Sequence, residues 1–153
     1  MYEEIKLDEC AIYRLPPLDS APSANGKNGR LQTGVVRSVS LDPGENVRWF
    51  DLGARGRAAL LGIVSTGAVA VRVHFADVQL TPGAQLFVRS LKNREEVYGP
   101  YEGRGVSADG SFWTPPVTGE GIVIEYFDPH QGTREETAAP PFRITEVSHE
   151  FRD

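Results

Sequence analysis

The feature that most constrains the fold is a regular alternation of side-chain type between Ala68 and Leu80. Large apolar residues occupy every second position from 69 to 75, and smaller or polar residues lie between them. Successive side chains of a β-strand point to opposite faces of a sheet, so this period of two predicts a strand with one buried face. The apolar positions change parity at Val78, which predicts a bulge or bend near Asp77.

Shorter segments of the same kind recur along the chain, separated by turn sequences rich in Gly and Pro. Residues 57–66 are apolar at both odd and even positions, which predicts a strand covered on both faces. No convincing helical period and no internal repeat are present. We therefore predict an all-β fold, a jelly-roll-like β-sandwich of about eight short strands. Strands are expected at 10–15, 33–41, 47–52, 57–66, 68–80, 84–90, 97–98, 121–127 and 142–151, and an extended piece begins at Phe112 and Trp113.

The 153 residues are enough for one domain, but the first 32 differ from the rest. A cluster of Pro, Ser, Asn and Gly between positions 16 and 29 is typical of a linker. We predict an N-terminal arm and flexible loop over residues 1–32, followed by the sandwich over 33–153. Cys10 is the single cysteine, so the chain cannot form an internal disulfide, and its state is left open.

Composition and charge exclude several classes of protein. A hydrophobic fraction of 40% and a charged fraction of 24% are typical of a soluble globular chain. The net charge of −5 argues against a nucleic-acid partner, which would require clustered basic residues. No apolar run is long enough to span a membrane. The first residues lack the basic and apolar regions of a signal peptide, which leaves open a cytoplasmic protein or a trimmed exported one.

The sequence contains no motif that predicts a metal or cofactor site. His74, His130 and His149 lack the short fixed spacing of zinc ligands. Gly103–Ala108 loosely fits a dinucleotide-binding fingerprint, but Pro115 and Pro116 follow too closely for the required helix. We expect neither a metal nor a cofactor.

Two serines that lie near glycines do not fit a catalytic nucleophile. Ser65 lies in a segment one residue too long for the Gly-x-Ser-x-Gly turn, within an expected strand. Ser111 follows a glycine but lacks the glycines expected after a trypsin-like nucleophile. No acid–base–nucleophile set can be assembled, so we expect a protein that is not an enzyme.

Aromatic residues near the glycine-rich loop over 99–110 are the remaining candidates for a ligand site. Exposed, Tyr98, Tyr101 and Trp113 would form a platform for a sugar ring or a peptide. Buried with Phe112, they would close one end of the sandwich, an interpretation favoured by the large area that aromatic side chains bury.

Several segments carry a resemblance to a known family. These are Val71–Val88, Gly99–Gly103, Gly110–Pro115 and Ile144–Arg152. The half of the chain that contains them resembles a non-catalytic β-sandwich domain that precedes the trypsin-like catalytic domain in secreted bacterial endopeptidases, including those related to lysyl endopeptidases.

The resemblance implies an accessory or pro-region domain of an exported serine peptidase. Such a domain would assist folding, restrain the protease or bind substrate, and its partner would be the trypsin-like catalytic domain of the same precursor. It also implies a secreted or periplasmic location. No catalytic domain follows Asp153, so we expect either a chain cut at the boundary with the protease or a domain that acts alone. The alternative from another class is a carbohydrate- or surface-binding module acting through Tyr98, Tyr101 and Trp113, with a glycan or protein ligand.

Overall fold

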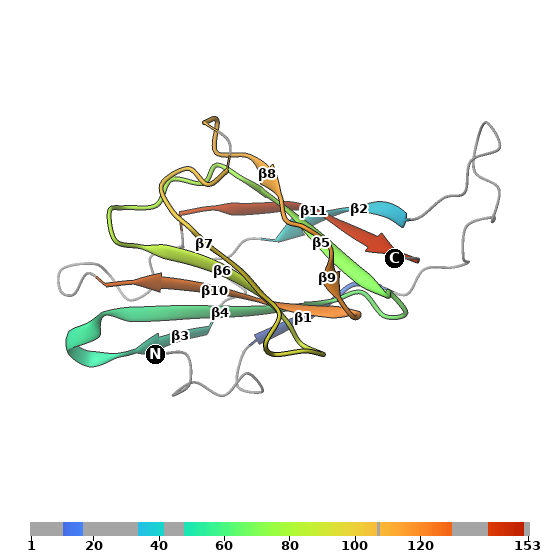
Figure 1. The fold of residues 1–153 in the computed structure, drawn as a ribbon, viewed down its shortest axis with the longest axis horizontal. Helices are drawn as coiled ribbons and strands as arrows, with labels where there is room; N and C mark the ends of the chain where they lie inside the picture. Colours follow the sequence, from blue (N-terminus) through green and yellow to red (C-terminus); the bar gives the residue numbers. More distant parts are fainter. Residues whose placement is uncertain (1–10, 17–33, 42–47, 107, 130–140, 152–153) are drawn as a thin grey trace.

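Eleven β-strands and one 3₁₀ helix make up the described part of the chain in a computed structural model (Figure 1). The structure describes residues 11–16, 34–41, 48–106, 108–129 and 141–151. No helix in these ranges is long and apolar enough to cross a membrane.

The strands are short, as the turn-rich sequence predicts. Their bounds are β1 Ala11–Arg14, β2 Gly34–Leu41, β3 Arg48–Asp51, β4 Arg57–Val64, β5 Ala70–Ala76, β6 Gln85–Ser90, β7 Val97–Tyr101, β8 Phe112–Trp113, β9 Val117–Thr118, β10 Gly121–Asp128 and β11 Arg143–Glu150, with the 3₁₀ helix at Gly53–Arg55.

The strands form two sheets that face each other, so the predicted all-β sandwich is confirmed. One, called sheet A here, has the order β1-β4-β10-β6-β7, and β3 also pairs with β4. The other, sheet B, has the order β2-β11-β5-β8, and β9 also pairs with β5. From β4 to β11 the chain passes from one sheet to the other five times, which brings turns from both sheets together at each end of the sandwich.

Strand β4 is covered on both faces, as its sequence predicts. Leu61 and Ile63 point into the main core between the sheets. Ala58 and Leu60 point the other way, where they form a second buried cluster with Val123 of β10. The strand ends at Val64, two residues before the expected end, and this places Ser65 in the turn that follows.

Strand β5 has the predicted alternation, with Val71, Val73 and Phe75 fully buried. It ends at Ala76, and Asp77 has a positive φ of 55°, so the chain turns where the parity change predicted a bend.

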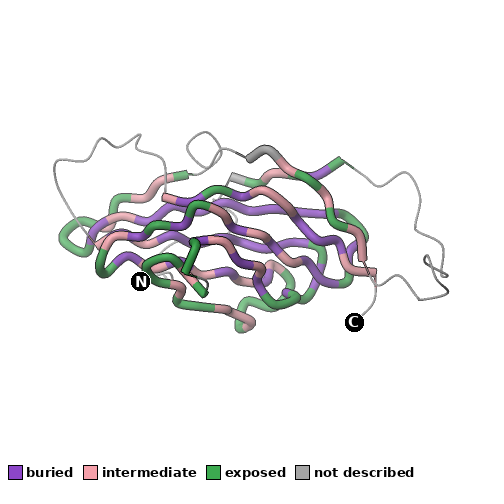
Figure 2. Tube along the Cα trace, turned by 90° about the horizontal axis from the view of Figure 1, so that it is seen from above, coloured by how far each residue is buried: buried purple, intermediate pink, exposed green. Residues whose placement is uncertain are grey.

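The core between the sheets is continuous along the strands (Figure 2). Its aromatic part is a chain of edge-to-face contacts, in which the ring of Phe142 lies 5.6 Å from Phe75 and 6.0 Å from Tyr126. Edge-to-face packing of this kind stabilises beyond the area that the rings bury.

Strand β1 comes from the segment expected to be an arm, and it pairs in parallel with the second half of β4. Ile12 and Arg14 then lie on the outer face of sheet A, whereas Tyr13 packs against the core. The expected flexible loop falls mainly on residues 17–33, and Cys10 and His130 also lie outside the described residues.

Candidate functional site

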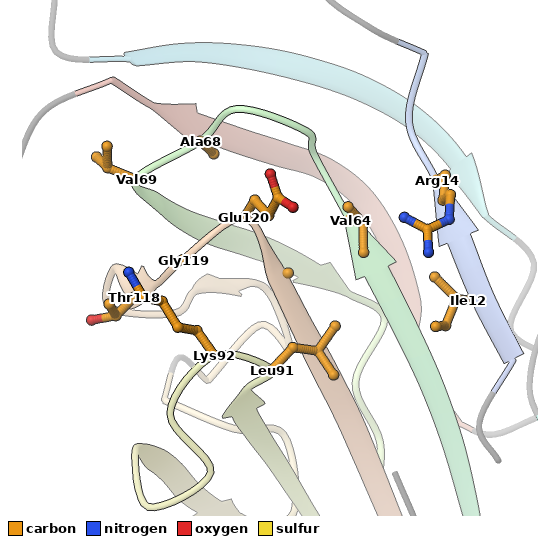
Figure 3. A pocket seen from close by; sticks show the side chains of 11 residues that line it. Ile12, Arg14, Val64, Ala68, Val69, Leu91, Lys92, Thr118, Gly119 and Glu120 are labelled. Carbon is orange, nitrogen blue, oxygen red and sulfur yellow. The ribbon is translucent and has the colours of Figure 1, made fainter. Parts of the chain in front are cut away.

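One end of the sandwich carries a pocket of about 730 Å³ (Figure 3). It lies where β1 and β4 end and where the β4–β5, β6–β7 and β9–β10 turns meet. We call it the end pocket. Its lining residues are Ile12, Arg14, Val64, Ala68, Val69, Leu91, Lys92, Thr118, Gly119, Glu120 and Gly121.

The end pocket combines apolar surface with charges of both signs. Ile12 and Val69 are 42% and 41% exposed, although large aliphatic side chains of a folded domain are usually buried. Arg14 lies beside Ile12 on one side of the pocket, and Lys92 lies on the opposite side (Figure 3). A lining that mixes apolar and charged side chains in this way resembles the surface of a protein–protein interface.

The turn between β4 and β5 is fixed to the pocket wall by Glu120. The backbone N–H of Gly67 donates to the Glu120 carboxylate at 2.9 Å, and the N–H of Ser65 donates to the Glu120 carbonyl at 2.8 Å. Gly67 has a φ of 91°, which favours glycine at this position. The pocket is therefore a preformed surface on a hydrogen-bonded turn.

A second set of polar contacts holds Tyr98 beside the same end. Its hydroxyl donates to the Glu96 carboxylate at 2.9 Å, and the N–H of Thr118 donates to the same oxygen at 3.0 Å. Burial raises the pKa of Glu96, but the hydrogen bonds from Thr118 and Tyr98 outweigh it, and the pKa lies below its usual value. The pKa of the Tyr98 hydroxyl is raised by burial and by the neighbouring Glu96. Glu96 thus stays ionised and ties β7 to β9.

Behind the β4–β5 turn, a buried polar cluster joins the two sheets. The Oγ of Ser65 lies 2.6 Å from Nδ1 of His149 on β11, and Arg37 of β2 donates to the same Oγ at 3.0 Å. Arg37 also donates to the carbonyl of Pro16. The serine oxygen therefore accepts from Arg37 and makes a second hydrogen bond with Nδ1 of His149, in which the imidazole tautomer decides which group donates.

The short contact between Ser65 and His149 has the form of a nucleophile–base pair. Ser65 is fully buried and His149 is 2% exposed, so a substrate has no access to the hydroxyl. The pKa of His149 is lowered by burial and by the charge of Arg37, against an opposing effect of Glu150. A buried imidazole that is hydrogen-bonded to a buried serine and inaccessible to substrate fits a structural link between the sheets.

The candidate residues Tyr98 and Tyr101 lie together on β7, where both pack against the main core. The ring of Tyr101 lies 4.8 Å from that of Phe112, and burial raises the pKa of its hydroxyl. The two tyrosines are each partly buried, so they close the edge of the sandwich between β7 and β8 while keeping part of their surface exposed.

Trp113, the third candidate, lies on the outer face of sheet B. It pairs with His74, whose side chain alternates with the buried residues of β5 and therefore faces outward. The rings of His74 and Trp113 are 5.1 Å apart, and the guanidinium of Arg72 lies 5.3 Å from the Trp113 ring. The structure therefore does not bring Trp113 together with Tyr98 and Tyr101, because Trp113 faces outward from sheet B whereas both tyrosines pack against the core.

Sequence reasoning missed the Ser65–His149 cluster and the end pocket. Ser65 was expected inside a strand, an expectation that was wrong because β4 ends one residue before it. One feature of the sequence could have indicated the cluster. His149 lies on the same strand face as the buried Val147, and a buried imidazole needs a polar partner because burial without one is costly. No group of His, Cys, Asp and Glu suited to a metal ion is found among the described residues.

These features define an all-β sandwich domain with a preformed pocket at one end. The model of the family described as "Lysyl endopeptidase N-terminal domain" matches residues 7–151. The chain belongs to this family, and the resemblance seen in the sequence is confirmed. Comparisons with the curated proteins and with the solved structures gave no match.

Proposed function

We propose that this domain is a non-catalytic partner of a lysyl endopeptidase-type catalytic domain in the same precursor, and that it docks through the end pocket. Membership of a family of protease N-terminal domains is the observation that carries this proposal. The domain restrains the protease or assists its folding in an exported precursor.

The position of the pocket supports this docking mode. Strand β11 is the last strand, and it ends at Glu150 beside the pocket, where the Glu150 carbonyl accepts a hydrogen bond from Val69 at 2.9 Å. Figure 1 places the end of β11 and the start of β5 at the same end of the sandwich. A catalytic domain joined after β11 would meet this end first, and the covalent connection would raise its effective concentration there.

The chemistry of the pocket also favours a protein partner. Ile12 and Val69 are partly exposed, so a partner that covers them makes binding more favourable by about 25 cal/mol for each Å² of apolar surface buried. Arg14, Lys92 and Glu120 then set the orientation through charge complementarity rather than adding much affinity.

The test is a binding titration between the chain and the purified mature catalytic domain, followed by calorimetry. Val69→Asp places a charge in the apolar lining, and we expect it to weaken binding roughly tenfold or more. Val106→Asp is the matched control because Val106 is 73% exposed and lies outside the pocket lining. Absence of binding by the unaltered chain would refute the proposal, and equal weakening by both variants would refute the docking site.

The two roles, restraint and folding assistance, are separated by activity measurements. Inhibition of the folded protease by the added chain supports restraint. A higher yield of active protease on refolding with the chain supports assistance. Fractionation of cells that express the full precursor tests the proposed secreted or periplasmic location.

Sugar binding at Trp113 is a second candidate function. The observation that favours it is an indole ring on the outer face of sheet B, with Arg72 and His74 within about 5 Å of it. Glycan arrays with the unaltered chain and with Trp113→Ala test this function. Glycan binding that is lost in the variant supports it, and the absence of binding to any glycan by the unaltered chain refutes it. Tyr98→Phe serves as a comparison, because Tyr98 lies on the other sheet.

A further inference from the structure

The chain contains few lysines for its content of basic residues. Of the 16 residues that are Lys or Arg, three are lysines and the other 13 are arginines. Lys6 and Lys27 lie outside the described residues, and Lys92 is the one lysine in the part of the chain that the structure describes. A protease specific for lysyl bonds therefore meets a sandwich that offers one lysine.

Lys92 is exposed in the loop over residues 91–96 that joins β6 to β7, and it lines the end pocket. The backbone of Gly119 packs closely against its side-chain stem, since a Cβ built at Gly119 would lie 2.9 Å from the Cβ of Lys92. The ammonium group makes no hydrogen bond or ion pair with any described residue. The charge is therefore available to a partner.

The peptide bond after Lys92 is anchored on both sides by the same hydroxyl. The N–H of Lys92 and the N–H of Asn93 both donate to Oγ of Ser90, at 3.1 and 3.0 Å. Ser90 is fully buried, and its Oγ donates to the carbonyl of Thr118 at 2.6 Å. A hydroxyl has one donor and two acceptor positions, so this one is saturated and cannot turn away without breaking three bonds.

The rest of the loop is held as firmly. The carbonyl of Asn93 accepts from the N–H of Glu96 at 3.0 Å, and its side-chain oxygen accepts from the N–H of Glu95 at 3.2 Å. The carbonyl of Arg94 accepts from Arg89 at 2.6 Å, and Arg89 is fixed in turn by the buried Glu125 at 3.1 Å. The loop presents Lys92 on a rigid frame, which lowers the entropy lost when a partner binds it.

We propose that Lys92 is the residue through which a lysine-specific catalytic domain engages this domain, and that the loop acts as a slowly cleaved inhibitory loop. This inference rests on the proposed function and names the contact that restrains the protease. The lysine side chain enters the enzyme's specificity site, while the end pocket around it supplies the surrounding interface.

The hydrogen bonds to Ser90 explain why the chain would stay bound to the protease after the Lys92–Asn93 bond is cleaved. Hydrolysis of the Lys92–Asn93 bond breaks its C–N bond and forms a C–O bond from water, leaving a carboxylate on Lys92 and an ammonium group on Asn93. The nitrogens on both sides of the cut remain hydrogen-bonded to Ser90. The new ends stay next to each other, so the cleaved chain remains bound and the bond can form again.

The test uses the full chain with Lys6→Arg and Lys27→Arg, which leaves Lys92 as the only lysine. Inhibition of a purified lysyl endopeptidase is measured with a chromogenic lysyl substrate, and cleavage of the chain is followed by mass spectrometry. We expect Lys92→Gln to weaken inhibition about 30-fold or more, as removal of a central interface residue does. The matched control is Arg94→Gln, an exposed basic residue of the same loop, which should change inhibition less than threefold.

The outcomes separate this inference from the proposed function. If the chain binds the protease and Lys92→Gln inhibits equally well, the proposed function stands and the role of Lys92 is refuted. If the chain is cut after Lys92 within a few turnovers and released, the loop is an ordinary substrate and the inference fails. If the chain neither binds nor inhibits, both proposals fail. Slow cleavage after Lys92 that becomes faster in Ser90→Ala supports the anchoring mechanism directly.

Discussion

Replacing Ser65 by alanine tests whether the buried cluster holds the two sheets together. The change removes the hydroxyl that accepts from Arg37 at 3.0 Å and lies 2.6 Å from Nδ1 of His149. His149 is 2% exposed, so its ring nitrogen would be left buried without a partner, at a cost of about 1–3 kcal/mol. Arg37 is only partly buried and keeps its bond to Pro16, so water replaces its lost acceptor at a cost of about 1 kcal/mol.

The expected loss in the free energy of unfolding is therefore about 2–4 kcal/mol, a large share of the roughly 5–15 kcal/mol that stabilises a typical domain. Urea unfolding at pH 7.5, followed by tryptophan fluorescence, measures it. Ser38→Ala is the matched control, because Ser38 is an exposed serine on β2 and its loss should cost less than about 0.5 kcal/mol. A loss below about 0.5 kcal/mol for Ser65→Ala as well would show that the cluster does not link the sheets.

Two further predictions concern buried charged or titratable groups. Burial and Arg37 lower the pKa of His149, so the folded state disfavours protonation of its ring. The free energy of unfolding should therefore be highest above the ordinary histidine pKa of about 6.5 and should fall as the pH drops below it. Urea unfolding measured between pH 7.5 and 5.5 should show this dependence, and His149→Gln should reduce it. Glu125 is fully buried against Arg89, and burial raises its pKa against the lowering effect of that arginine. Arg89→Met alone should lower the free energy of unfolding by about 3–5 kcal/mol, because it leaves a buried carboxylate unpaired. The double variant with Glu125→Met should recover much of this loss, and a double-mutant cycle measures the difference.

The strand pattern was predictable because it depends on neighbouring residues. The alternation in β5 gave its buried face directly, and the two-sided apolar character of β4 matched a strand with a core on each side. Both signals depend on the period of two in a pleated strand, which is local information. The exact ends were less predictable, since β4 ends at Val64 through hydrogen bonds that its turn makes with Glu120.

The sites were not predictable because each depends on pairing between distant segments. Ser65 and His149 are 84 residues apart; Ser65 directly follows β4 of sheet A, and His149 lies on β11 of sheet B. Tyr98 and Trp113 are close in sequence, yet Tyr98 packs against the core from sheet A and Trp113 lies on the outer face of sheet B. Knowing which face each residue occupies requires the sheet assignment of its strand, and no local period supplies that assignment.

The two ends of the sandwich differ in which side chains hold them together. One end is closed by the rings of Tyr101 and Phe112, which contact each other and the core. At the opposite end, two buried serine hydroxyls make the fixing contacts: Ser65 links the sheets, and Ser90 holds the loop that carries Lys92. A serine hydroxyl is small, so it stabilises a turn without shielding the neighbouring side chains from solvent. The apolar and charged side chains at this end therefore stay accessible. The end where β11 finishes is therefore held in place by hydrogen bonds and is also accessible to a partner.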